Sequence, residues 1–393
     1  MTEAPKTLSY QDLVHIILGA HFYACGGGGA LQNGMSLLEE IKTFFGSAES
    51  VKIGLSNIHD IDDKDHLSVL AAMGAPEEFL KKGYGKSPVK AFEDYQKLKG
   101  VTFATVSPVE TGAIAYGMSL LTAAVFDIPI INGDGGGRAF PCLQLSTFAN
   151  NELQTPIAAS PCVLTSETSI ADGGATVQIL CESSADIDAM TRGIISYSTS
   201  FDQRASLASF AMTGQQLKQT NAVVPDMLTK SLVLGKKLSE HIRMGKSCFE
   251  VLDRLPGAQR VMLGKLVNIN SQTQGGFDWV TLEYADSDTG NTFYVISQNE
   301  NMLLWSSQLS EPIAMGPDLI CCVTSNASLM SNDEILGAWT ANPNDARLQD
   351  MAIYTLPAAK QIQQPWFHTQ FEQIFQKLNY FGSYHPPRSI KGN

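Results

Sequence analysis

The residues best suited to chemistry lie between Asn132 and Pro141, where the sequence NGDGGGRAFP contains one carboxylate, one guanidinium and four glycines. Glycines let the backbone approach a ligand closely and adopt positive φ, while Asp134 and Arg138 place opposite charges within reach of one ligand. The alternative is a tight turn in which Asp134 and Arg138 form a structural ion pair. The stretch therefore predicts either a ligand site or a rigid turn.

Glu110 is a second candidate for catalysis. It follows a predicted strand at residues 101–106 and precedes an uncharged run, residues 112–126, that is typical of a buried helix. Ligands bind at strand ends in open α/β sheets, which favours a catalytic role for Glu110. The structural alternative is that this carboxylate interacts with the dipole of the following helix.

Four consecutive glycines, Gly26, Gly27, Gly28 and Gly29, offer a row of unshielded backbone N–H groups. A predicted helix at residues 37–45 follows them, and a loop that leads into a helix N-terminus is suited to binding an anion. The pattern is neither a P-loop nor a dinucleotide-binding fingerprint, so nucleotide binding is unsupported. The remaining alternatives are a substrate-binding loop and a flexible connector between two helices.

His21 and Cys25 stand four residues apart just before these glycines. Cys25 beside a glycine-rich turn is a candidate nucleophile with His21 as its base. The same spacing on a helix is equally typical of two side chains that pack together. The sequence leaves both interpretations open.

Composition excludes several classes of partner. The formal net charge is −12 and basic runs are missing, which argues against nucleic acids and anionic membrane surfaces. The longest uncharged stretch, residues 13–38, is interrupted by histidines and glycines and is a poor membrane span. Since the N-terminus also lacks a signal-peptide pattern, we expect a cytoplasmic protein. The seven cysteines, scattered without a C-x-x-C pair, predict free thiols.

The elements that position these residues alternate between strands and helices in the first half of the chain. Strand-type runs span residues 51–55, 69–73, 101–106 and 126–131. This alternation predicts an N-terminal three-layer α/β domain with a mostly parallel sheet over residues 1–260. A second α/β portion is expected from about residue 160, with strands at 175–181 and 207–212, a helix at 185–197 and a longer helical region at 225–255.

The pattern changes near Gly264. Short β-type runs at residues 265–269, 280–284, 292–296 and 319–324 are separated by Gly, Asp, Asn and Pro. This pattern is typical of a small β-barrel or sandwich, expected over residues 261–365. Residues 366–393 are predicted to form a C-terminal helix and tail. The fold class expected for the whole chain is therefore α/β plus all-β.

Seven motifs, in order along the chain, resemble those of one protein family. They are Gly26 to Gly29, Gly74-Ala75-Pro76, Glu110 with Gly112, Asp134 with Gly137-Arg138-Ala139-Phe140-Pro141, Gly275-Gly276-Phe277, Asn299-Glu300-Asn301 and Pro317-Asp318-Leu319-Ile320. The family is that of S-methyl thiohydantoin desulfurase, which is associated with hydantoinase- and oxoprolinase-like proteins. The resemblance extends over nearly the whole chain.

The resemblance implies an N-terminal α/β domain, a C-terminal β-barrel domain and a hydrolase. The implied reaction converts an S-methylated thiohydantoin to a hydantoin with release of methanethiol. Two further classes stay open: a non-catalytic partner subunit of a hydantoinase- or oxoprolinase-type enzyme, and a small-molecule binding protein. Convergent charges in a glycine-lined turn favour the hydrolase, because a scaffold subunit does not need them.

The expected site combines these residues in named roles. Glu110 and Asp134 would divide the acid and base roles, and Arg138 would hold a substrate carboxylate bidentately. The glycine N–H groups would stabilise developing negative charge. The residues expected to contact substrate are Arg138, Gly26, Gly27, Gly28, Gly29, Asn132, Gly136, Gly137 and Glu300.

One departure from the family pattern bears on cofactors. Members commonly carry an aspartate at the position of Asn132, and this change weakens any chemistry in which paired aspartates bind a metal or share a proton. The sequence requires no cofactor, although a divalent metal is not excluded. The expected partner is a small molecule, a carboxylated five-membered ring, and a homo-oligomer is left open.

Overall fold

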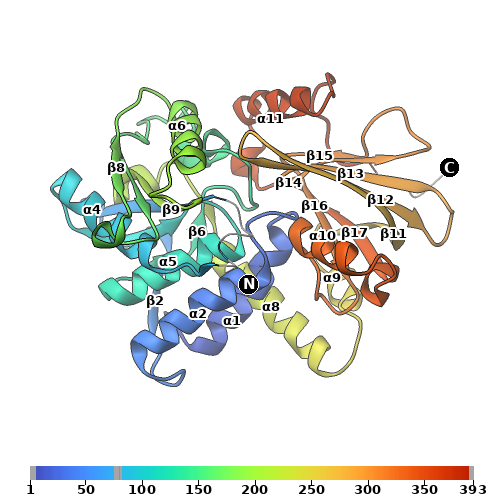
Figure 1. Ribbon diagram of the computed structural model, residues 1–393, viewed down its shortest axis with the longest axis horizontal. Helices are drawn as coiled ribbons and strands as arrows, with labels where there is room; N and C mark the ends of the chain where they lie inside the picture. Colours follow the sequence, from blue (N-terminus) through green and yellow to red (C-terminus); the bar gives the residue numbers. More distant parts are fainter. Residues whose placement is uncertain (1–5, 75–78, 80–81, 389–393) are drawn as a thin grey trace.

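The computed structural model describes residues 6–74, 79 and 82–388. In this part of the chain there are two large β-sheets and one short two-stranded sheet, with helices around them (Figure 1). Ala75 and Pro76 of the second family motif lie outside the described residues.

The first sheet has eight strands in the order β1-β2-β5-β4-β3-β9-β7-β8. Neighbours from β2 to β3 pair in parallel, whereas β1 and the strands from β9 outward pair antiparallel. The bounds are β1 (Thr7–Leu8), β2 (Ile53–Ser56), β3 (His66–Gly74), β4 (Phe103–Pro108), β5 (Ile130–Ile131), β7 (Cys162–Ser166), β8 (Thr176–Ile179) and β9 (Arg204–Thr213). The sheet is mixed, with a parallel centre as expected.

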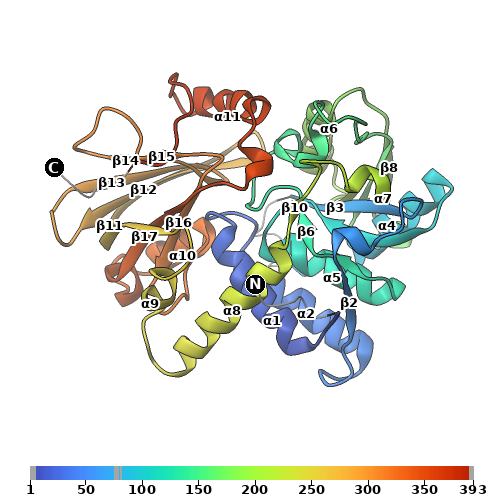
Figure 2. The ribbon, with the colours of Figure 1, turned by 180° about the vertical axis from the view of Figure 1, so that it is seen from behind.

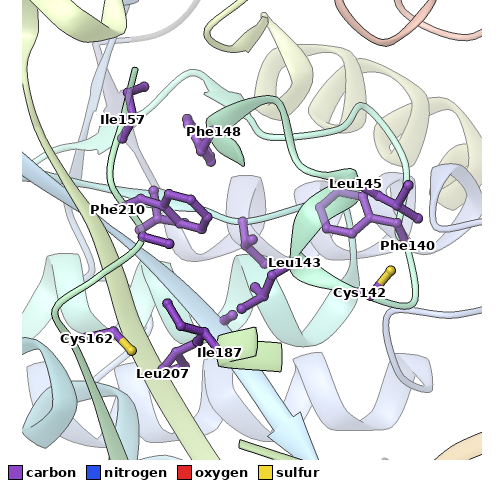
Figure 3. Packing of buried hydrophobic residues seen from close by; sticks show 14 of the residues in the cluster. Phe140, Cys142, Leu143, Leu145, Phe148, Ile157, Cys162, Ile187, Leu207 and Phe210 are labelled. Carbon is purple, nitrogen blue, oxygen red and sulfur yellow. The ribbon is translucent and has the colours of Figure 1, made fainter. Parts of the chain in front are cut away.

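Helices and loops cover both faces of this sheet and make three layers. Along β3, Leu70 packs into the core beneath the helices α1, α2, α4 and α5, while Val69 and Ala71 pack into the opposite core. The opposite core contains α6 and the segment around Phe140 and Phe148 (Figure 3). The helix bounds are α1 (Tyr10–Tyr23), α2 (Leu31–Phe45), α4 (Lys86–Lys99), α5 (Ala113–Phe126), α6 (Ser184–Tyr197) and α7 (Gly214–Leu217).

The uncharged run after Glu110 forms the buried helix α5, as predicted. The strand predicted over residues 126–131 is shorter, because Phe126 still belongs to α5 and Asp127, at φ 51°, caps that helix. Helix and strand are hard to separate by periodicity in an apolar run. After β5, a second short strand, β6 (Gly133–Asp134), pairs with β10 (Val224–Pro225).

The second sheet is antiparallel and forms a half-barrel, with strand order β15-β14-β13-β12-β11-β17-β16. Its strands are β11 (Gln259–Gln274), β12 (Phe277–Asp286), β13 (Thr292–Gln298), β14 (Glu300–Ser306), β15 (Ala314–Met315), β16 (Leu319–Thr324) and β17 (Met351–Leu356). The fold is therefore α/β plus β, as the sequence predicts. The strands β14, β15 and β17 were missed.

The turn before β14 explains part of this omission. The sequence predicts that Asn299-Glu300-Asn301 closes a strand, but the chain reverses at Asn299 alone, at φ 57°. Asparagine tolerates this left-handed conformation better than most residues. Glu300 consequently opens a new strand, where it lies opposite Gln298 just before an irregularity in the pairing of β13 and β14.

Two long helices connect the sheets. α1 packs along α8 (Met227–Arg243), and both contribute to a core shared with the half-barrel, in which Phe22 and Leu238 meet Tyr354 (Figure 1, Figure 2). The remaining helices are α9 (Phe249–Leu252), α10 (Asn332–Ala341) and α11 (Pro365–Lys377). The loop that leaves the end of α1 lies between the two sheets.

Candidate functional site

A cavity of about 100 Å³ lies where the loop after α1 meets both sheets. Its wall comes from the glycine loop, the ends of β3 and β4, and the hairpin that opens β14. The lining residues are Gly26, Gly27, Gly28, Gly29, Ala72, Met73, Gly74, Phe79, Glu110, Ile114, Ala115, Phe140, Pro141, Arg192, Asp278, Asn299, Glu300, Asn332 and Asp333.

The glycine loop forms part of the cavity wall. Larger side chains do not fit at its positions. Gly26, Gly28 and Gly29 have positive φ, which other residues rarely adopt. A Cβ at Gly28 would lie 2.9 Å from the Cα of Gly112, and one at Gly27 would collide with the carboxyl group of Glu300. The loop is therefore packed against Glu300 and the start of α5, and it is not a free connector.

Glu300 is the most deeply buried carboxyl group of the cavity. It is 4% exposed, and its Oε2 has no hydrogen-bond partner among the described residues. Burial raises its pKa to about 8, although the charges of Arg138 and Arg192 and the N–H of Gly28 act in the opposite direction. Glu300 therefore keeps a proton well above the pH at which an ordinary glutamate ionises.

Glu110 faces the same cavity from the end of β4. Its Oε2 accepts a hydrogen bond from the backbone N–H of Phe140 at 3.0 Å. Burial and then the neighbouring charge of Glu300 raise its pKa well above the usual value, and the Phe140 N–H offsets only part of this. The Glu110 side chain is half-buried, and it lines the cavity.

Glu110 and Glu300 behave as one titrating pair. The charge of Glu300 contributes to the raised pKa of Glu110, and two carboxyl groups coupled in this way can supply one site with an acid and a base. Glu110 comes from the α/β domain and Glu300 from the half-barrel. The pair thus assembles only where the two domains meet.

The wall opposite this pair contains residues that the sequence analysis did not select. Asn332, at the start of α10, is 3% exposed and its Oδ1 has no partner among the described residues. Arg192 of α6 donates to Asp188 at 2.8 Å and to the carbonyl oxygens of Gly276 and Pro141. No motif in the sequence marks either residue, because each reaches the cavity from a distant element.

Asp134 lies behind the cavity and is fully buried. It accepts hydrogen bonds from the N–H groups of Gly136 and Gly137 at 2.9 and 2.6 Å. The hydroxyls of Tyr116, at 2.6 Å, and Thr111 also donate to it. The Asp134 carboxylate therefore holds the glycine-rich turn in place. Like Asp134, Gly136 and Gly137 do not line the cavity.

Arg138 also has protein partners in place of a substrate. Its guanidinium, 0% exposed, donates to the carbonyl oxygens of Ala139, Pro317, Asp318 and Asn301, at distances between 2.8 and 3.3 Å. These bonds tie the turn to the half-barrel. The expected ion pair with Asp134 is not among its hydrogen bonds, and its charge reaches the cavity only through space, by lowering the pKa of Glu300.

Asn132 is buried at the carboxyl end of β5 and does not line the cavity. Its Oδ1 accepts from the N–H and hydroxyl of Thr229, each at 3.1 Å, near the start of α8. Its Nδ2 donates to Asn57 and Asp226. The change from aspartate to Asn132 therefore affects the contact with the start of α8 and not the cavity wall.

His21 and Cys25 do not face each other. His21 Nε2 lies 2.9 Å from Glu334, whereas the Cys25 thiol donates to the carbonyl oxygen of Tyr23. Burial opposes ionisation of Cys25, but a hydrogen bond with Cys321 and the charge of Arg138 lower its pKa to about 7. Neither side chain lines the cavity, so this pair is not assembled for nucleophilic attack.

Two negative findings concern the described residues alone. Within them, no group of three or more His, Cys, Asp and Glu side chains is arranged to hold a metal ion. None of the helices in this part of the chain has the length and apolar character needed to cross a membrane.

The fold defines a two-domain protein with a small cavity between an α/β domain and an antiparallel half-barrel. The chain belongs to the S-Me-THD-like family, since the N-terminal domain model of that family matches residues 11–171 and the C-terminal domain model matches residues 182–337. The resemblance found in the sequence is confirmed.

A solved structure supports the same fold. The crystal structure of a protein from Chromobacterium violaceum is similar over 97% of this chain and 99% of that chain, with 25% sequence identity and a TM-score of 0.78. No curated protein matches the sequence significantly.

Proposed function

We propose that the protein is a hydrolase of a small cyclic amide or thioimidate, acting in the manner of an S-methyl thiohydantoin desulfurase. The observation that carries the proposal is the carboxyl pair Glu110 and Glu300, which line one small cavity between the domains and both have raised pKa values. Membership of the S-Me-THD-like family supports the choice of substrate class.

The two carboxyl groups take different roles. Glu300 ionises more readily, because Arg138, Arg192 and the Gly28 N–H all lower its pKa. It is therefore the base that accepts a proton from the attacking water. Glu110, whose pKa is raised well above its usual value by burial and then by the charge of Glu300, keeps its proton and is the acid.

The reaction balances with these two groups. Water adds its oxygen to the ring carbon that bears the S-methyl group, and Glu300 takes one of its protons. Glu110 donates its proton to the ring nitrogen as charge builds there. The carbon–sulfur bond then breaks, methanethiol leaves with a proton and the ring carbon becomes a carbonyl. Proton transfer from Glu300 back to Glu110 restores the pair.

The site as proposed differs from the sequence expectation in one role. Asp134 was expected to share catalysis with Glu110, but Glu300 now takes that role, since Asp134 is surrounded by its own donors. The carboxylate of the expected five-membered ring was assigned to Arg138, whose N–H groups are already engaged. The ring itself is therefore the part that the cavity recognises.

An assay of methanethiol release tests the proposal. Purified protein is incubated with S-methyl thiohydantoin, with and without a chelator, and compared with Glu110→Gln and Glu300→Gln. We expect each variant to lower kcat by about 10²- to 10⁴-fold, the usual contribution of general acid–base catalysis. Glu152→Gln, on an exposed loop, is the matched control. Full turnover in either cavity variant would refute the role of that carboxyl group.

A further inference from the structure

We propose that Asn332 determines substrate specificity, because its Oδ1 accepts a hydrogen bond from an N–H of the substrate ring. This inference rests on the proposed function and names the feature of the ring that the cavity recognises. It assigns a substrate contact to a residue that lies outside every motif found in the sequence.

The orientation of the Asn332 side chain is fixed by the protein. Its Nδ2 donates to the carbonyl oxygen of Asn299 at 2.9 Å, and its backbone N–H donates to the carbonyl oxygen of Gly26 at 2.7 Å. A flipped amide would set Oδ1 against the Asn299 carbonyl, so the observed orientation is the favourable one. Oδ1 is therefore left as an acceptor at the cavity.

This acceptor has no partner among the described residues although the side chain is 3% exposed. Buried polar atoms are nearly always hydrogen-bonded, so an exception in a cavity wall indicates a ligand. Gly26 lies directly against this oxygen, where a Cβ would be 2.7 Å from Oδ1, so a larger residue at this position would press on it. A ligand N–H would satisfy this oxygen.

The charge of the cavity supports the same class of ligand. Four carboxyl groups line it, from Glu110, Glu300, Asp278 and Asp333. Arg192 is the one lysine or arginine in the described lining, and it is paired with Asp188 at 2.8 Å. Such a cavity offers an anionic group no unpaired lysine or arginine among its described residues, and this favours a neutral or cationic ring with N–H donors. Any carboxylate on the substrate must point away from these four groups.

Calorimetric titration with hydantoin, 1-methylhydantoin and 3-methylhydantoin tests this proposal. We expect methylation of the recognised nitrogen to weaken binding to the unaltered protein about tenfold, the usual effect of losing one hydrogen bond to a buried group. Asn332→Ala should bind hydantoin about tenfold more weakly and should no longer distinguish it from that N-methyl form. Asn344→Ala, on an exposed turn, is the control.

A second variant guards against a folding defect. Asn332→Ser keeps a small polar side chain at the start of α10 and should show the same loss of discrimination with an unchanged melting temperature. Equal affinity of the unaltered protein for all three rings, or undiminished hydantoin binding in both variants, would overturn the proposal. Discrimination without methanethiol release would support the role of Asn332 while refuting the hydrolase. Methanethiol release that is unchanged in the Asn332 variants would support the hydrolase while refuting the role of Asn332.

Discussion

The two sides of the glycine-rich turn use similar residues in opposite ways. Behind the turn, Asp134 and Arg138 are fully buried and each has at least four hydrogen bonds within the protein. In front of it, Glu300 and Asn332 are almost as buried, yet each has an oxygen without a partner. Burial and charge alone therefore do not identify a functional group. The difference lies in whether its hydrogen bonds are already made.

Arg138→Met is expected to have the largest effect on stability. The change leaves carbonyl oxygens of both domains without a donor, and we expect a loss of about 3 kcal/mol or more in the free energy of unfolding. Urea unfolding measures it. Arg347→Met is the control, because that arginine is exposed and forms an ion pair with nearby Asp345, and it should change stability by less than about 1 kcal/mol. A stable Arg138→Met protein would show that the guanidinium does not join the domains.

Asp134→Asn should have the second largest effect. An amide keeps one acceptor for the turn but cannot receive every donor that now points at the carboxylate, so we expect a loss of about 2 kcal/mol. Turnover per folded molecule should fall far less than in Glu110→Gln. Asp288→Asn, at an exposed turn, serves for comparison. A catalytic loss as large as that of Glu110→Gln at full stability would return Asp134 to the mechanism.

Stability and activity should both depend on pH through Glu300, which lies in front of the glycine-rich turn. Glu300 has its pKa raised from 4.5 to about 8, so the folded state binds a proton that the unfolded chain has lost between these values. Stability from this group is present below pH 4.5 and is lost as the pH rises to about 8. Activity, which needs ionised Glu300, should rise over the same interval.

Thermal unfolding and kcat/KM measured across this interval check the prediction. Glu300→Gln should reduce the decline of melting temperature with pH, because the variant cannot ionise there. A melting temperature whose decline with pH is as steep in Glu300→Gln as in the unaltered protein would contradict the assignment.

Cys25→Ala is expected to have the smallest effect. The thiol has a pKa of about 7, a property of reactive cysteines, but it is fully buried and does not line the cavity. Methanethiol release should stay within about threefold of the unaltered protein, since the thiol contributes no step of the proposed reaction. A loss as large as that of Glu300→Gln would revive the nucleophile hypothesis.

Sequence patterns predicted the fold well where periodicity is strong. The uncharged run before residue 127 became α5, and the residues 319–324 became β16 with the expected bounds. The strand β14 was missed because one asparagine, Asn299, makes the whole turn and leaves no cluster of turn residues.

Only part of the site was predictable for a physical reason. Glycines and Glu110 at a strand end are local signals, and they do line the cavity. Asp134 and Arg138 give the same kind of signal, but their partners come from α5 and the half-barrel. No local pattern shows whether a buried charge is satisfied by a distant carbonyl. Asn332 carries no local signal at all.

The division of the carboxyl pair between two domains has a consequence for inheritance. Glu110 lies in the part matched by the N-terminal domain model and Glu300 in the part matched by the C-terminal one. A recombination event between homologous genes that joins foreign halves keeps the pair only if the new halves meet with the same fit. Under the proposed function, the two halves must therefore be inherited together for the pair to be kept.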